Sequence, residues 1–324
     1  MALLEVKDLT VSFKLGSKYY DVVRNLSFQV EKGDSLAIVG ESGSGKTTAA
    51  MAIMGLLPRN AIVKSGSILF NGVDLVKLSK DEWGSIRWKR IAMVFQASQN
   101  ALDPVKKIGD QLVELYKYHN KNSNKEDAIT KVYEVLKMVN LDPSTFKLYP
   151  HELSGGMKQR VVIAASLLLD PELLIADEPT TALDVITQAE ILLLLRKIIK
   201  EKGLSLIFIT HDISLASTLC NKIVIMYGGS DMEQGSLKEI ITSPLHPYTK
   251  HLLRSLTELE EGRLILDKKR NNKVLEFEDQ KINGCPFFSK CPEATEKCSG
   301  HLPKRIDLRN RKIRCINVDD KAWS

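Results

Sequence analysis

The chain has 324 residues, of which 44% are apolar and 27% charged, with a formal net charge of +6. This composition is typical of a globular protein with a sizeable core and excludes a disordered chain. The longest apolar stretches, residues 161–169 and 191–195, are much shorter than the roughly 20 residues that a membrane-spanning helix needs. Residues 1–8 lack the basic start and long apolar run of a secretory leader, so we expect a cytoplasmic protein.

Short β-rich apolar runs, separated by helical patterns, predict an α/β fold with a mostly parallel sheet. The predicted strands cover residues 35–39, 91–95, 173–176 and 206–209. Amphipathic spacing in residues 108–118 and 128–139 predicts a helical subdomain over about 97–158. A charge-rich stretch without periodicity, residues 258–280, predicts a linker. We therefore expect a main domain over residues 1–257 and a small cysteine-rich extension over residues 258–324.

The first motif that carries chemistry directly follows the predicted strand 35–39 and matches the phosphate-binding pattern G-x-x-x-x-G-K-[ST]. Its glycines allow backbone N–H groups to surround phosphate oxygens, and the helix after it offers a positive N-terminal end. We expect Lys46 to reach the β and γ phosphates and the Thr47 hydroxyl to bind Mg²⁺. The predicted nucleotide contacts are Gly40, Ser42, Gly43, Ser44, Gly45, Lys46, Thr47 and Thr48.

A second motif, Asp177-Glu178-Pro179, ends the predicted strand 173–176. Because parallel strands present their carboxyl ends at one edge of the sheet, we expect these carboxylates to meet the phosphate loop there. Asp177 would support the Mg²⁺ shell, and Glu178 would orient and deprotonate the attacking water. An Asp-Glu-Pro sequence by itself is usually only a loop.

The segment 153–160, Leu-Ser-Gly-Gly-Met-Lys-Gln-Arg, resembles the signature motif of ABC ATPases and lies in that family's order between the phosphate loop and Asp177. Ser154 can cap the following helix, and Gly155 and Gly156 leave its N–H groups open to an anion. The resemblance implies an ABC-type P-loop fold in which two head-to-tail domains enclose two ATP molecules. Ser154, Gly155, Gly156 and Gln159 would then contact the nucleotide held by the facing domain.

Smaller matches to the same family follow in register. Gln96 resembles the Q-loop glutamine, which contacts Mg²⁺ and water beside the membrane subunit. Asp184 resembles the D-loop aspartate, and His211 the switch histidine that touches the γ-phosphate. Phe13 resembles the aromatic residue that stacks on adenine, although Tyr19 or Tyr20 could serve instead. The resemblance thus implies ATP hydrolysis with Lys46, Gln96, Glu178 and His211 as catalytic residues, and Thr47, Gln96 and Asp177 around Mg²⁺.

Several features are similar to the oligopeptide/dipeptide importer group of ABC ATPases, including His246-Pro247-Tyr248-Thr249, which lies outside the nucleotide motifs. Four of the five cysteines lie in the C-terminal region, and their spacing could enclose Zn²⁺ or an iron–sulfur cluster. Members of this group carry a [4Fe–4S] cluster there, so the resemblance favours a cluster bound by Cys285, Cys291, Cys298 and Cys315. Disulfides are disfavoured in a cytoplasmic chain. The fifth, Cys220, is predicted to be a core residue.

The resemblance implies a peripheral subunit at the cytoplasmic face of the membrane that powers import of oligopeptides, dipeptides or oligosaccharides. Its implied partners are two membrane permeases, a second related ATPase in preference to a second copy, and indirectly an extracellular substrate-binding protein. Residues 97–105 depart from the usual peptide-importer loop, which leaves the cargo open. The alternatives are a soluble ABC ATPase acting on nucleic acid and an iron–sulfur redox sensor; we read the basic stretches 268–270 and 309–312 as solvated surface, not as a nucleic-acid site.

Overall fold

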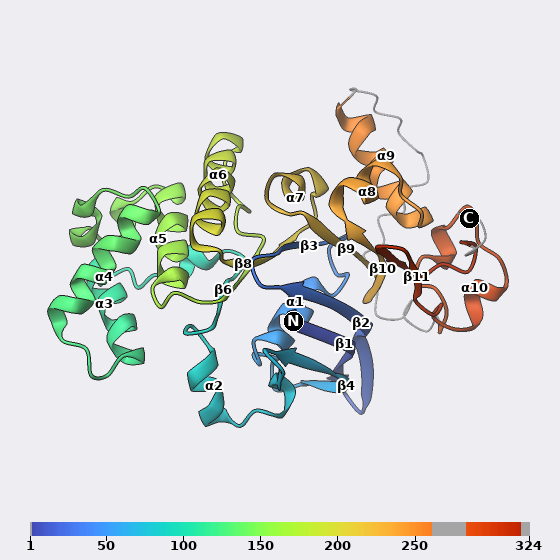
Figure 1. Cartoon of the computed structure of the whole chain (residues 1–324), viewed down its shortest axis with the longest axis horizontal. Coiled ribbons are helices and arrows are strands. Elements are labelled where there is room, and N and C mark those ends of the chain that lie inside the picture. Colours follow the sequence, from blue (N-terminus) through green and yellow to red (C-terminus); the bar gives the residue numbers. More distant parts are fainter. Residues whose placement is uncertain (1, 261–282, 319–324) are drawn as a thin grey trace. The chain divides into compact units, whose positions relative to one another are not determined.

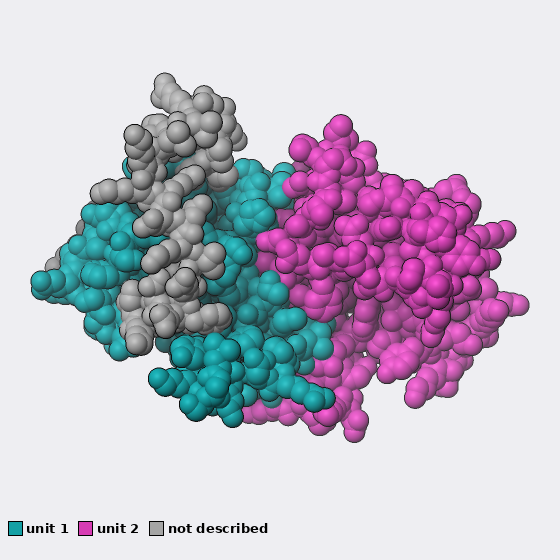
Figure 2. Space-filling model, turned by 180° about the vertical axis from the view of Figure 1, so that it is seen from behind, with its two compact units in different colours: residues 1–30, 36–76, 210–324 teal, residues 31–35, 77–209 magenta. Residues whose placement is uncertain are grey.

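The computed structural model describes residues 2–260 and 283–318, and it divides into two compact units. Unit 1 comprises residues 1–30, 36–76 and 210–324, and unit 2 comprises residues 31–35 and 77–209 (Figure 2). The predicted linker 258–280 starts within the last turn of a helix and otherwise lies outside the described residues. The predicted domain boundary after residue 257 therefore stays a prediction.

Unit 1 contains a four-stranded antiparallel sheet that the sequence did not predict. Its strand order is β2-β1-β4-β5, and β1 pairs with β4 from Leu4↔Phe70 to Phe13↔Ala61. Charged residues interrupt the apolar positions of these strands, which hides them from a search for apolar runs. The strands are β1 (Ala2–Leu15), β2 (Lys18–Glu31), β4 (Ala61–Phe70) and β5 (Val73–Asp74).

A second group of strands in unit 1 has the order β11-β12-β10-β9-β3. Only β3 and β9 are parallel, and the other pairs are antiparallel. Because β12 pairs with β10, the cysteine-rich region continues the sheet that carries the phosphate loop. The strands are β3 (Ser35–Val39), β9 (Lys222–Tyr227), β10 (Ser230–Ser236), β11 (Ile306–Leu308) and β12 (Arg311–Ile313).

Unit 2 contains three parallel strands, β8-β7-β6. Every residue of these strands is buried, which explains their uninterrupted apolar sequences. The strands β6 (Ile91–Val94), β7 (Leu173–Asp177) and β8 (Ser205–Thr210), together with β3, confirm the four strand predictions.

The two amphipathic patterns of the sequence are helices α3 (Ile108–His119) and α4 (Lys125–Met138) of unit 2, which confirms both predictions. They contact each other and α5, and all three lie together in Figure 1. Side-chain oxygens cap the N-termini of α4 and α5, from Asn124 and Ser154 respectively. The other α-helices of unit 2 are α2 (Lys80–Ile86) and α6 (Val185–Lys202), and α5 spans Gly155–Leu167.

In unit 1, α1 follows β3 and α8 follows β10. Cys220 ends α7 and is buried, as predicted for a core residue. Within the described residues, no helix combines the length and apolar character that crossing a bilayer requires. The helices are α1 (Lys46–Ile53), α7 (Ile213–Leu219), α8 (Leu237–Thr242), α9 (Pro247–Glu260) and α10 (Lys297–Gly300).

Candidate functional site

The phosphate loop of unit 1 joins β3 to α1 and is packed so closely that two of its positions exclude side chains. A Cβ on Gly40 would lie 2.1 Å from the carbonyl oxygen of Met226, and one on Gly45 would lie 2.9 Å from that of Val22. Gly45 also has a φ of 94°, in the left-handed region that favours glycine. Since α1 begins at Lys46, its free N–H groups lie at the end of this loop, where an anion can accept hydrogen bonds from them.

Lys46 is held by the loop itself. Its ammonium group donates hydrogen bonds to the carbonyl oxygens of Gly40, at 2.8 Å, and Glu41, at 2.9 Å, and the residue is buried. Ser44 is also buried, whereas Ser42 and Thr47 are exposed and Thr48 is half-buried. The loop therefore combines one fixed cation with accessible hydroxyl groups, which suits a phosphate and its metal ion.

The aromatic candidates for the nucleobase lie on one hairpin of unit 1. Phe13 lies on β1 and is half-buried, while Tyr19 and Tyr20 lie on the neighbouring strand β2. Tyr19 is 51% exposed and offers the most accessible ring of the three. His211 directly follows β8 and is exposed. The choice among the three rings, like the role of His211, stays a prediction.

In unit 2 the carboxylate of Glu178 is bound by two side chains. Oε2 of Glu178 accepts hydrogen bonds from Nε2 of Gln96, at 3.1 Å, and from the Thr181 hydroxyl, at 3.0 Å. Asp177 ends β7 and is 1% exposed, and Glu178 follows it with a φ of 45°. Such a left-handed conformation is rare for a residue with a side chain and is often found at functional sites. Thr181, two residues after the motif Asp177-Glu178-Pro179, was not among the residues predicted from the sequence.

The signature segment of unit 2 forms the start of α5. The Ser154 hydroxyl accepts a hydrogen bond from the N–H of Met157 at 3.2 Å, which confirms the expected cap. A Cβ on Gly156 would lie 2.6 Å from Cγ2 of Thr187, on α6. Asp184 in turn caps α6 and accepts hydrogen bonds from Thr187, which lower its pKa and keep the carboxylate charged. The signature and D-loop segments are thus in direct contact.

Gln159 does not extend into solvent with the other signature residues. It is 2% exposed, and its Nε2 has no hydrogen-bond partner within residues 2–260 and 283–318. A buried amide without a hydrogen bond is energetically costly, so packing alone does not explain a glutamine at this position. Its predicted contact with a nucleotide stays a prediction.

The four C-terminal cysteines line one small cavity, which His246 and Arg314 also border. Burial raises the pKa of Cys285 to about 11, and burial likewise raises the pKa of Cys291 and Cys315. Nevertheless, in the described part of the chain no group of three or more Cys, His, Asp or Glu side chains is arranged to hold a metal ion. This geometry therefore does not support the expected [4Fe–4S] cluster or Zn²⁺ bound by Cys285, Cys291, Cys298 and Cys315. The four cysteines line one cavity, but their side chains are not arranged as ligands of one metal ion. All five cysteines are free.

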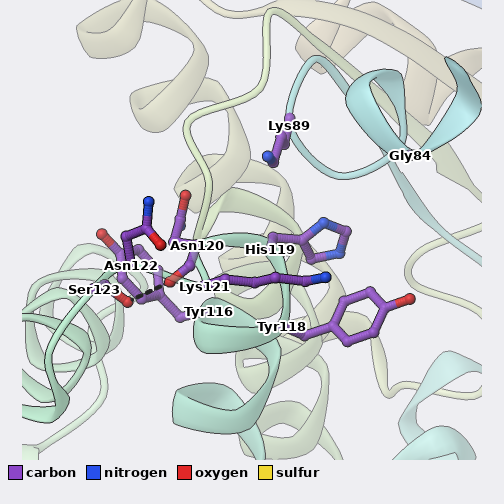
Figure 3. A pocket seen from close by; sticks show the side chains of 9 residues that line it. All are labelled: Gly84, Lys89, Tyr116, Tyr118, His119, Asn120, Lys121, Asn122 and Ser123. Atoms are coloured by element: carbon purple, nitrogen blue, oxygen red, sulfur yellow. Dashed lines mark hydrogen bonds between the residues drawn. The ribbon is translucent and has the colours of Figure 1, made fainter. Parts of the chain in front are cut away.

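A separate pocket of about 760 Å³ lies on unit 2, where the turn between α3 and α4 faces the segment after α2 (Figure 3). Its nine lining residues include Lys89, His119 and Lys121 and no carboxylate. Burial and the charge of Lys89 lower the pKa of His119. None of the nine is a predicted nucleotide contact, so this pocket is distinct from the candidate nucleotide residues.

Two family models match the sequence. A model described as "ABC transporter" matches residues 23–181, which include the phosphate loop, the signature segment and the Asp177-Glu178 pair. A model described as "Oligopeptide/dipeptide transporter, C-terminal region" matches residues 232–298, which include His246-Pro247-Tyr248-Thr249.

Curated relatives match along nearly the whole chain. The dipeptide transport ATP-binding protein DppD of Haemophilus influenzae is 41% identical over 317 residues, covering 97% of this chain and 95% of its own. The oligopeptide transport ATP-binding protein OppD of Escherichia coli is 42% identical over 305 residues, covering 93% and 89% respectively. Sequence similarity is therefore not confined to the nucleotide motifs.

Solved structures with the same fold include the ATP-binding cassette MJ0796 in a dimeric post-hydrolysis state bound to ADP and Pi. It has a TM-score of 0.65 and 29% identity, and the match covers 72% of this chain and 98% of that one. CbiO1 of Clostridium perfringens has a TM-score of 0.66 and 27% identity, covering 81% and 96%. The ABC-type α/β fold predicted from the sequence is confirmed.

Proposed function

The chain belongs to the ATP-binding subunits of ABC transporters of the oligopeptide/dipeptide type, and we propose that it hydrolyses ATP to drive peptide import through membrane permease subunits. The observation that carries this proposal is the bonded pair of Gln96 and Glu178 at the end of β7, in a chain that also holds a complete phosphate loop. Transport-coupled ATP hydrolysis is the activity of this family.

We propose a role in binding ATP·Mg²⁺ for the predicted residues of each unit. The phosphate loop would bind the triphosphate through its N–H groups and Lys46, while Thr47 and Asp177 would hold Mg²⁺. Glu178 would accept a proton from the attacking water, and Gln96 would fix the orientation of that carboxylate through its 3.1 Å hydrogen bond. His211 would contact the γ-phosphate, and Phe13 or a tyrosine of the same hairpin would stack on the base.

A second ATPase chain would complete this site. Ser154 and its helix would bind the triphosphate held by the facing chain, and we favour a related ATPase over a second copy. The presence of a facing chain is supported by two exposed apolar residues at the start of α6. Val185 and Ile186, which follow Asp184, are 82% and 74% exposed. Exposed apolar side chains beside a predicted ligand-binding segment are typical of a surface covered by a partner.

The contact with the membrane subunits is proposed to lie at residues 97–105, directly after Gln96. Val105 in this loop is 80% exposed, and Ala97 has a φ of 54°. A loop that joins Gln96 to a partner would transmit the partner's movement to the Glu178 carboxylate. The expected location is therefore the cytoplasmic face of the membrane, as a peripheral subunit, with a substrate-binding protein acting through the permeases.

Peptides are the proposed cargo, because the similar curated proteins are named for dipeptide or oligopeptide transport. The test is ATP-driven uptake into vesicles that hold the complete transporter, with labelled peptides in one arm and labelled oligosaccharides in the other. Peptide uptake that depends on Lys46 would support the proposal. Uptake of oligosaccharides but not of peptides would replace peptides as the proposed cargo. ATP hydrolysis stimulated only by nucleic acid would overturn the proposed transport function.

We also propose that the four cysteines bind one metal centre when it is supplied. The support is their common cavity, and four thiolates are suitable ligands for an iron–sulfur cluster or Zn²⁺. The raised pKa values concern the metal-free thiols, and metal binding requires their deprotonation. ATP hydrolysis as described above does not require this centre.

A further inference from the structure

The segment His246-Pro247-Tyr248-Thr249 is similar to the oligopeptide/dipeptide importer group but has no role in the nucleotide chemistry described above. In the structure it forms the start of α9, and all three of His246, Tyr248 and Thr249 are buried, with exposed fractions of 1%, 0% and 0%. Buried polar groups need specific partners, because each unsatisfied group is costly, and two of these three, His246 and Tyr248, make hydrogen bonds. The identity of those partners indicates what the segment does.

One partner is the phosphate loop. The N–H of Glu41 donates a hydrogen bond to the Tyr248 hydroxyl at 3.3 Å. Burial raises the pKa of Tyr248, so the hydroxyl stays neutral and can accept this bond. Glu41 is the loop's second residue, and its carbonyl oxygen accepts from the ammonium group of Lys46 at 2.9 Å. Tyr248 and Lys46 therefore hold opposite sides of the same short segment.

The segment itself is fixed by β10. The carboxylate of Glu233, which is 0% exposed, accepts hydrogen bonds from the N–H groups of Leu245 and His246 at 3.0 Å each. Nδ1 of His246 accepts from the N–H of Tyr248 at 3.0 Å. These bonds satisfy N–H groups at the start of α9 and leave the Tyr248 ring little freedom.

Phe287 of the cysteine-rich region packs against the Tyr248 ring. The Phe287 ring, 2% exposed, lies 5.3 Å from the Tyr248 ring and 5.4 Å from that of Tyr227, and the two tyrosine rings lie 4.5 Å apart. Aromatic pairs at these distances contribute stability beyond their buried area. A Cβ on Gly228 would lie 2.5 Å from Cβ of Pro286, so the two segments meet without space between them.

We propose that Tyr248 is a positioning residue for ATP binding: its hydroxyl, backed by Phe287 of the cysteine-rich region, fixes the Glu41 peptide and so preorganises the phosphate loop. The inference rests on the proposed function of that loop. It gives His246-Pro247-Tyr248-Thr249 a role in the nucleotide site and makes the cysteine-rich region part of the structure that supports ATP binding. A preformed loop binds its ligand more tightly because less ordering accompanies binding.

The test compares Tyr248→Phe with Tyr227→Phe in the full chain. Both replacements remove one hydroxyl from a buried ring of the same cluster, but the Glu41 N–H donates to Tyr248, whereas the Tyr227 ring lies 5.7 Å from the ammonium group of Lys290. We expect Tyr248→Phe to raise the dissociation constant for ATP about 2- to 10-fold, the range that one net hydrogen bond provides. Amide exchange in residues 38–44 should quicken in this variant, and Tyr227→Phe should bind ATP as the wild type does.

An unchanged ATP affinity in Tyr248→Phe, or an equal loss in Tyr227→Phe, would overturn the inference. A loss accompanied by faster exchange throughout residues 36–76 would also overturn it, because the ring would then be a general structural residue. If the wild-type chain itself fails to bind ATP, the proposed function fails instead, so the two failures are distinguishable.

Discussion

Gln96 and Glu178 lie 82 positions apart in the sequence, yet Nε2 of the first donates a hydrogen bond of 3.1 Å to Oε2 of the second. The bond joins Gln96, two residues after the end of β6, to Glu178, which follows β7, and these strands are parallel neighbours. Since the same oxygen also accepts from Thr181, the carboxylate has a fixed orientation before any water reaches it. The pair therefore connects the proposed base to the loop proposed to meet the membrane subunit.

Replacing Glu178 by Gln should lower the rate of ATP hydrolysis by roughly 10²- to 10⁴-fold, the usual contribution of a general base. The amide keeps the shape of the side chain, so ATP affinity should remain within a factor of about two. ATP binding and steady-state hydrolysis by the assembled transporter give both quantities. A variant that turns over ATP at the wild-type rate would exclude Glu178 as the base.

Both residues of this pair could be predicted from the sequence. Glu178 follows an apolar strand, and strands buried on both faces are the easiest elements to recognise; Gln96 was predicted from its resemblance to the Q-loop glutamine of ABC ATPases. Their hydrogen bond could not be predicted, because it depends on the register between β6 and β7 and on the left-handed conformation of Glu178. Thr181 was missed for the same reason. Its side chain reaches Glu178 only because the chain turns sharply there.

Replacing Gly156 by Ala should destabilise the chain by about 1–3 kcal/mol, because the new Cβ would lie 2.6 Å from Cγ2 of Thr187. Thr187 cannot move aside easily, since its hydroxyl donates to Asp184 at 2.6 Å. Adding Thr187→Ser removes the clashing methyl group, keeps the hydroxyl, and should restore most of the loss. Urea unfolding of the single and double variants measures the coupling; equal losses with and without Thr187→Ser would disprove the contact.

A matched control is Gly155→Ala at the neighbouring position. There the nearest atom to a new Cβ is Cδ2 of Leu183 at 3.6 Å, an ordinary contact. We expect this variant to unfold within about 0.5 kcal/mol of the wild type, and Ala even favours the helix. Two adjacent glycines of one motif should therefore differ in their effect on stability, which the sequence alone does not reveal.

The cysteine-rich region shares the second sheet of unit 1: β12 pairs with β10, and Arg314 and Arg305 both form ion pairs with Asp231. Sequence reasoning could not find this arrangement, because residues 311–313 are too few and too charged to predict a strand. Arg314, two residues after the basic stretch 309–312, is 5% exposed. Burial of an arginine is tolerated only where a carboxylate pairs with it.

Replacing Asp231 by Ala should therefore destabilise unit 1 by about 3–5 kcal/mol, because Arg314 would be left buried without its charge partner. The matched control is Glu293→Ala, which removes the ion pair between Glu293 and Lys250. The Lys250 side chain is 40% exposed and the Glu293 side chain is 46% exposed. Such an exposed pair contributes less than about 1 kcal/mol. Thermal unfolding of both variants tests the contrast, and equal midpoints would show that the region is not held by Asp231.

The last prediction concerns the four cysteines, which line one cavity without forming a ligand set in the described geometry. If they bind a metal centre, chain produced in iron-supplemented, oxygen-free conditions should contain iron and acid-labile sulfide in equal amounts, and Cys291→Ser should abolish both. Zinc without sulfide would identify the alternative ion. Cys220→Ser is the matched control, because Cys220 is buried elsewhere, at the end of α7. Its metal content should equal that of the wild type. A wild-type chain free of both metals would show that the cavity holds only thiols; the raised pKa values of Cys285, Cys291 and Cys315 would then keep these three protonated and slow to react at neutral pH.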